Sequence, residues 1–297
     1  MSELAPASTG DLAILVLQRN GADFLEHAPG ARAGSDPFHV HQMRVATRRM
    51  RAALRLFADT LPVGATTLNE ELKWFASQLG PVRDLDVQLH RVHATAGTLG
   101  VAGPLAAYAD WLENQQQCAR KKLAEAFESR RFGALVQGLQ RLDAWPIAES
   151  PPVVAEAPRQ LRQAYTQLRK RANAVDDQTP AAALHAVRIR AKRLRYTAEF
   201  FQPTYGKPAR RLAERVVSVQ DLLGNLQDGI VSRQHIHAAV QSSADGWPAQ
   251  TTLALGRLVQ FEADREMELR AGFPDAYRGV QKAWRRLPKL AAARKQG

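Results

Sequence analysis

The chain has 297 residues, 45% of them hydrophobic and 24% charged, as expected of a folded protein with a sizeable core. Its net charge of +12 and pI near 10.3 indicate a polyanionic partner: nucleic acid, an anionic membrane surface or some other polyanion. The single cysteine, Cys118, excludes an intramolecular disulfide and is typical of a reducing cytoplasm, and the sequence contains neither a recognisable secretion signal nor an apolar run that could span a bilayer.

Apolar periodicity predicts helices almost throughout, without strand-like alternation of useful length. Asp36 and Thr179 each precede a proline, a pairing typical of a helix N-terminus. Gly80 and Gly224 are expected to end a helix and open a turn. In chain order, the predicted helices are 9–28, 37–59, 66–79, 82–97, 104–128, 132–144, 158–174, 180–202, 208–223, 226–242, 248–271 and 275–291.

The second half of the chain repeats the first at an offset of 144 residues, from His41 to His185. Gly80 and Gly224 share this offset, so the simplest interpretation is a tandem duplication. We therefore predict an all-α fold of two antiparallel helical bundles, related by pseudo-two-fold symmetry around a basic central groove or pore. The expected organisation is a single domain over 1–297, with repeats at 9–145 and 158–291 and a linker at 146–157.

The repeated segment is a basic helix. Five arginines and no acid lie between Pro37 and Ala58, and five Lys or Arg residues and no acid lie between Pro180 and Ala198. Like charges one turn apart are unfavourable, so a bound anion or acids on other helices must compensate them. A solvated face, or arginines paired with acids such as Asp86, is the alternative interpretation. On a helical wheel the stripes are His41, Arg44, Arg48, Arg51 and Arg55, and His185, Arg188, Lys192 and Arg195, with Glu199 in the position of Arg55. The opposite sides should face the core: Met43, Ala46, Met50, Leu54 and Phe57 in the first copy, and Val187, Leu194, Ala198 and Phe201 in the second.

Four histidines form repeat-related pairs, His41 with His185 and His93 with His237. A metal site would need three or four close ligands, and the spacing supplies none, so we predict no metal. Structural hydrogen bonding and donation to a phosphate oxygen both stay open. If histidines bind the anion, affinity should rise as the pH falls through their titration range.

The duplicated His-x-x-Arg-x-x-x-[Arg/Lys]-Arg-x-Arg helix, followed each time by a Gly-x-x-x-Asp motif, resembles the CHAD domain (conserved histidine α-helical domain) over about residues 9–291. The resemblance implies binding of inorganic polyphosphate and association with polyphosphate granules in the cytoplasm. Gln227 stands where the first half has Arg83, so the resemblance does not support an equivalent contact in the second half. The implied binding residues are His41, Arg44, Arg48, Arg49, Arg51, His185, Arg188, Lys192, Arg193 and Arg195; Arg55 extends the stripe, and Arg83, Asp84, Asp228, His93 and His237 are supporting candidates.

The predicted function is non-catalytic polyphosphate binding, without a cofactor or a membrane partner. Binding of RNA or another nucleic acid through the same surface is the alternative, although few aromatic residues are available to stack on bases. We find no phosphate-binding glycine loop, nucleophile motif or metal-binding carboxylate set that would indicate an enzyme. A homodimer stays open.

Overall fold

The computed structural model describes residues 7–34, 36–147, 149–242 and 246–287, and these parts of the chain contain helices and no strand. The predicted all-α class is confirmed. None of the described helices is long and apolar enough to cross a membrane. The helices are α1 (Thr9–Ala33), α2 (Pro37–Leu56), α3 (Gly64–Leu99), α4 (Ala102–Glu128), α5 (Arg130–Gln140), α6 (Val153–Ala172), α7 (Ala181–Phe200), α8 (Gln202–Tyr205), α9 (Lys207–Ser242) and α10 (Ala249–Arg285), with short 3-10 turns at Ala58–Thr60 and Leu142–Ala144.

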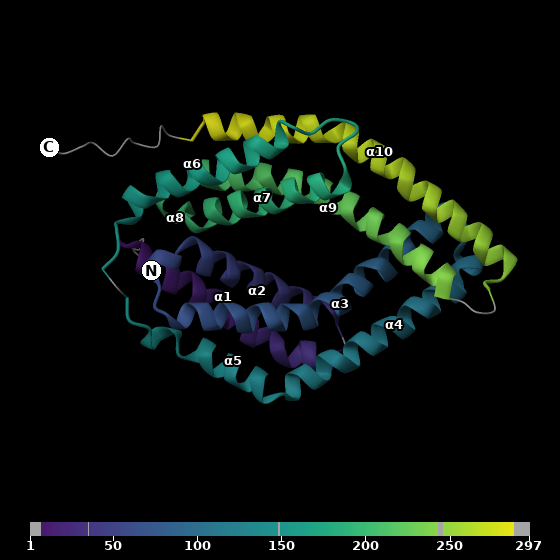
Figure 1. The fold of residues 1–297 in the computed structure, drawn as a ribbon, viewed down its shortest axis with the longest axis horizontal. Coiled ribbons are helices and arrows are strands. Elements are labelled where there is room, and N and C mark those ends of the chain that lie inside the picture. Colours follow the sequence, from purple (N-terminus) through teal and green to yellow (C-terminus); the bar gives the residue numbers. More distant parts are fainter. Residues whose placement is uncertain (1–6, 35, 148, 243–245, 288–297) are drawn as a thin grey trace.

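The helices form two groups that meet along α2 and α7 (Figure 1). One group contains α1, α2, α5 and the first part of α3; the other contains α6, α7, α8, the first part of α9 and the last part of α10. A single apolar core runs through both groups. Phe57, which follows α2, packs against Phe200 and Phe201 of the second half, with ring centroids 6.2 and 6.0 Å apart. The two halves are therefore joined by buried aromatic contacts.

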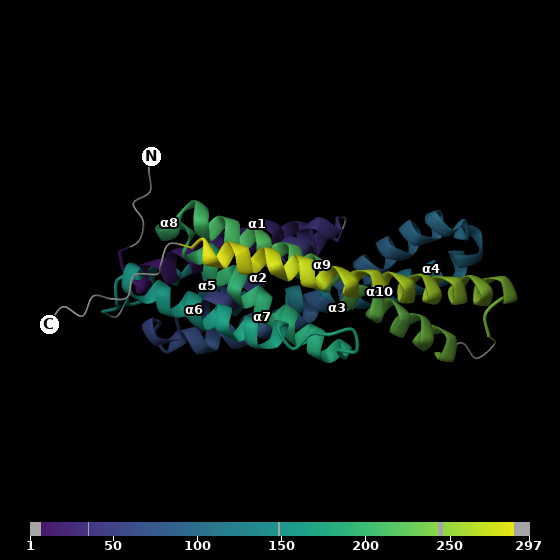
Figure 2. The same cartoon turned by 90° about the horizontal axis from the view of Figure 1, so that it is seen from above.

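A second apolar core lies at the far end of the elongated molecule, where α4 and the first part of α10 extend with the last parts of α3 and α9 (Figure 2). Tyr108 and Leu112 of α4 pack there with Leu258 of α10, and all three are almost fully buried. Since each half contributes two helices to this core, it ties the halves together a second time.

The predicted faces of the two basic helices are confirmed. Met43 and Met50 of α2 and Leu194 of α7 are completely buried, as the helical wheel predicts. Asp36 caps α2 as expected, because its carboxylate accepts a hydrogen bond from the Phe38 amide at 2.8 Å. The matching prediction for Thr179 is wrong: its hydroxyl donates to Asp176 at 2.8 Å and does not cap α7.

The predicted breaks at Gly80 and Gly224 are wrong. Helices α3 and α9 each run for 36 residues without interruption, and neither glycine has the positive φ of a helix-ending cap. Helix α10 likewise continues through Pro274, where a break was expected.

Two further boundaries differ from the predictions. Helix α6 starts at Val153, inside the expected linker 146–157. Helix α1 runs through Pro29 to Ala33 and ends at Gly34, whose φ of 72° is the left-handed conformation that glycine adopts without strain. A glycine or proline in the sequence therefore does not by itself mark a helix end: Gly34 ends α1, whereas Pro29 and Pro274 lie inside helices.

Candidate anion-binding site between α2 and α7

A pocket of about 620 Å³ opens between α2 and α7. The described residues that line it include no aspartate and no glutamate. The other lining residues are apolar or carry a hydroxyl group: Ala52, Leu56, Ile189, Tyr196, Thr197 and Phe200. The pocket is thus a concave site of a single sign of charge, which concentrates the electric field on a bound anion. Its basic residues are Arg48, Arg51, Arg55, Arg190, Lys192 and Arg193.

Three arginines in and beside the pocket have an unsatisfied Nε donor. The Nε atoms of Arg48, Arg51 and Arg188 are buried, with no hydrogen-bond acceptor among the described residues. Leaving a buried donor unsatisfied costs about 1–3 kcal/mol, and more for a charged group. An anion that enters the pocket would supply acceptors, and planar guanidinium groups suit phosphate oxygens.

Lys192 lies at the centre of this charge. Its pKa is lowered to about 7, first by burial and then by the nearby guanidinium groups of Arg188, Arg48 and Arg44. Burial also lowers the pKa of Arg48, and Arg44 and Arg195 act in the same direction. Burial and mutual repulsion therefore disfavour the positive charge of these side chains.

We expect anion affinity to rise as the pH falls through the range in which Lys192 gains its proton. With a free pKa of about 7, the lysine must be protonated at a cost when the anion binds at higher pH. An anion raises this pKa, so the favourable contribution is complete below the free value and is lost as the pH rises through the bound one. Between about pH 8.5 and about pH 6 the gain should be roughly tenfold.

Isothermal titration across this range measures the effect. Lys192→Arg is the matched control, because arginine stays charged throughout and should flatten the profile. A wild-type profile that is equally flat would contradict a protonation event at Lys192.

Gly80 and Gly224 each lie directly against an arginine side chain of another helix. A Cβ added at Gly80 would lie 3.2 Å from a terminal nitrogen of Arg44, and one at Gly224 would lie 3.3 Å from a terminal nitrogen of Arg188. Each glycine lets a guanidinium group lie close against a continuous helix.

The acidic candidates are positioned beside these arginines. Asp84 forms an ion pair with Arg44 at 3.5 Å. The pKa of Asp228 is raised by burial, against the effect of the nearby Arg188. Asp86 instead contacts Arg120 and Gln116. Pairing with acids therefore applies to Arg44, whereas no carboxylate of the described residues forms an ion pair with a cation that lines the pocket.

Arg49 and Arg195 do not line the pocket. Both bind Glu199 of α7: Arg49 at 3.0 Å and Arg195 at 2.6 Å. Glu199 is only 16% exposed, so this neutralisation takes place in a partly desolvated position. These two predicted binding residues are occupied by a carboxylate.

The first-half position that corresponds to Glu199 is an arginine, Arg55, and so has the opposite charge. At the offset of 144 residues, Arg193, Arg51 and Arg55 correspond to Arg49, Arg195 and Glu199. The pKa of Arg55 is lowered by partial burial and then by Arg51 and Arg193, which places these three cations together. One side of the α2–α7 contact therefore contains two arginines and a glutamate, whereas the other contains three arginines.

The histidines divide into two groups. His41 is partly buried, and its pKa is lowered by burial and by Arg83, Arg48 and Arg44, so it lies within the cationic cluster. His185, His93 and His237 are exposed on α7, α3 and α9. In the described parts of the chain, no three His, Cys, Asp or Glu side chains are grouped as metal ligands would be.

Sequence reasoning missed Arg190. It lines the pocket and donates to the side-chain oxygen of Gln167 at 2.9 Å. Its counterpart in the first half is Ala46, so the repeat gave no signal for it. Only the absence of acids along the whole of 180–198 could have indicated it.

Comparison with known proteins identifies the family. The model of the CHAD domain matches residues 15–237. This chain belongs to the CHAD domain family. The crystal structure of the CHAD domain from the plant Ricinus communis superposes with a TM-score of 0.76 at 24% identity, covering 95% of this chain and 94% of that one. PptA from Streptomyces chartreusis superposes with a TM-score of 0.68 at 19% identity, covering 95% of this chain and 100% of that one. Both likenesses support the CHAD-domain fold.

Two curated relatives, uncharacterised proteins from two strains of Mycobacterium tuberculosis, are 31% identical over 259 residues. The match covers 83% of this CHAD protein and 49% of each relative, so the chain spans about half the length of the curated relatives it matches.

Proposed function

We propose that this CHAD domain binds inorganic polyphosphate, without altering it chemically, in the pocket between α2 and α7. The observation that carries the proposal is the lining of six basic residues and no carboxylate, with buried Nε atoms of Arg48 and Arg51 that have no acceptor among the described residues. A linear phosphate polymer supplies many closely spaced anionic acceptors. It would compensate both the unsatisfied donors and the mutual repulsion of the cations.

The residues divide by role in this proposal. The polymer contacts the pocket cations, to which we add Arg190, and continues along the stripes through Arg44, Arg188, His41 and His185. Asp84 and Asp228 orient the arginines beside them. Arg49 and Arg195 contact the polymer only when Glu199 releases them. No residue is assigned a catalytic role.

We also propose that 9–145 and 158–291 arose by duplication and form the two walls of a basic groove. The equal lengths support this: α2 and α7 have 20 residues each, and α3 and α9 have 36 each. The matched approach of Arg44 to Gly80 and of Arg188 to Gly224 is further support. Association with polyphosphate granules would follow from binding the exposed polymer.

Chain length tests this function. From Arg44 to Arg55 a helix rises about 17 Å, longer than a triphosphate can span. Long polyphosphate should therefore bind at least about 100-fold more tightly than triphosphate. The slope of its log affinity against log salt concentration should be steeper by roughly 0.7 for each additional phosphate contact. Titration of both ligands at several salt concentrations measures this. Equal affinities and equal salt slopes would contradict a site that extends along both helices.

A further inference from the structure

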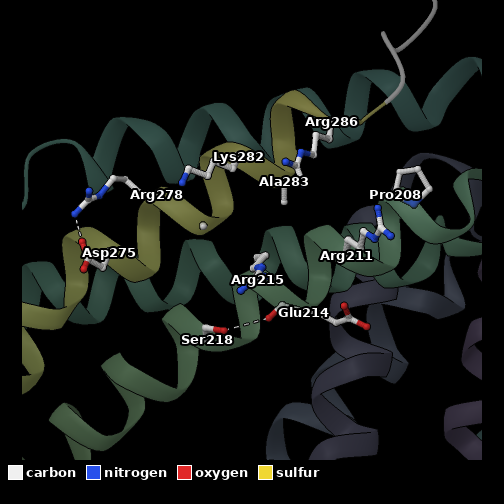
Figure 3. Close-up of a pocket in the computed structure, with 11 residues that line it drawn as sticks. Pro208, Arg211, Glu214, Arg215, Ser218, Asp275, Arg278, Lys282, Ala283 and Arg286 are labelled. Carbon is white, nitrogen blue, oxygen red and sulfur yellow. Dashed lines mark hydrogen bonds and ion pairs between the residues drawn. The ribbon is translucent and has the colours of Figure 1, made fainter.

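A second cationic groove lies outside the α2–α7 pocket. It has a volume of about 940 Å³ and runs between α9 and the last part of α10. Figure 3 shows that Arg211 and Arg215 on α9, and Arg278, Lys282 and Arg286 at the end of α10, border the same space. None of its lining residues belongs to the α2–α7 pocket. The groove is therefore a separate feature.

Its carboxylates do not neutralise it. Asp275 forms an ion pair with Arg278, and Glu214 forms one with Arg210, which is not a lining residue. Within the described ranges, no carboxylate pairs with Arg211, Arg215, Lys282 or Arg286. The groove therefore retains excess positive charge.

The cations follow the helix period. Arg211 and Arg215 are one turn apart, as are Arg278, Lys282 and Arg286. Like charges at this spacing repel, each pair costing about 0.2–0.5 kcal/mol on an isolated helix. Two such rows on neighbouring helices match an extended anion with charges along its length.

We propose that this groove is a second binding site for a linear phosphate polymer, which lets one molecule hold two segments of polymer at once. The inference rests on the proposed function and extends it. Among the described residues, no aromatic side chain lines the groove, so they offer no surface for stacking nucleobases, and a polymer of phosphate alone fits the groove better than single-stranded nucleic acid does. Because its cations are exposed, its affinity is lower and more sensitive to salt than that of the α2–α7 pocket.

The test titrates wild type and three variants with a polyphosphate of defined length that is too short to reach both grooves. The second-groove variant is Arg211→Gln with Arg215→Gln and Lys282→Gln. The pocket variant is Arg48→Met with Lys192→Met. The matched control removes three exposed cations of α4 and α5: Lys121→Gln, Lys122→Gln and Arg130→Gln.

We expect wild type and the control to bind two equivalents, one tight and one at least tenfold weaker. The second-groove variant should lose only the weaker equivalent, and the pocket variant only the tighter one. With long polyphosphate, light scattering should show cross-linked assemblies for wild type and much weaker ones for the second-groove variant, which still binds.

A single equivalent in wild type, or a second-groove variant that titrates and scatters like the control, would overturn the second site while leaving the pocket intact. Absence of binding to wild type would instead overturn the proposed function, and the second site with it. Circular dichroism melting confirms that each variant is folded.

Discussion

Replacing Arg48 and Lys192 together by methionine should lower the affinity for long polyphosphate by about 100-fold or more. Each charged hydrogen bond to a phosphate contributes about 1.5–3 kcal/mol, and a tenfold change in affinity corresponds to about 1.4 kcal/mol. Both residues line the pocket, and both lie among other cations. Methionine keeps most of the side-chain length, so the change removes charge more than volume.

The same variant should be more stable than wild type when no ligand is present. The lowered pKa values of Arg48 and Lys192 mean that the folded protein bears an electrostatic cost at these positions. We therefore expect a higher Tm without polyphosphate and a smaller increase in Tm on adding it.

Thermal melts with and without ligand measure both effects, and Lys121→Met with Lys122→Met is the charge-matched control. A lower Tm with unchanged affinity would show that the two residues are structural and would contradict a role in binding.

Replacing Glu199 by glutamine should raise polyphosphate affinity by about tenfold, because it releases Arg49 and Arg195 from their shared carboxylate. Two additional phosphate contacts should also steepen the slope of log affinity against log salt concentration by roughly 1.4. The unliganded protein should melt at a lower temperature, since two partly buried arginines lose their partner.

The matched control is Glu156→Gln, which removes a carboxylate paired with Arg159 on α6 and changes the net charge equally. Glu199→Arg should raise polyphosphate affinity more than Glu199→Gln does, because it reproduces the arginine found at position 55 in the first half. If Glu156→Gln and Glu199→Gln raise affinity by the same amount, net charge alone accounts for the effect and the local role of Glu199 is wrong.

The helical class and the buried faces could be predicted from sequence because they depend on periodicity, which is local. Met43 and Leu194 lie in the core as the helical wheel predicts, and Asp36 caps its helix. Gly80 and Gly224 could not be interpreted correctly in this way. Each accommodates an arginine from another helix, and no local pattern distinguishes such a glycine from one that ends a helix.

The site itself was only partly predictable. The stripe indicated the cations. Nothing in the sequence distinguishes Arg49 from the other arginines of α2, because its contact with Glu199 on α7 depends on the packing of the two halves. Arg190 lies off the repeated motif, and only the packing of α7 against α2 shows that it lines the pocket. The charge pattern of the sequence therefore predicted an anion-binding surface, whereas only the tertiary structure shows which of its cations are paired with a carboxylate.

Binding of long-chain polyphosphate to the purified protein near about 150 mM salt, with excess total RNA as competitor, tests the central claim most directly. A pocket of converging, partly desolvated cations should hold polyphosphate tightly at this salt, and the RNA should not displace it. Loss of binding at this salt, or ready displacement by RNA, would contradict a polyphosphate site and would show that α2 and α7 present a general polyanion surface.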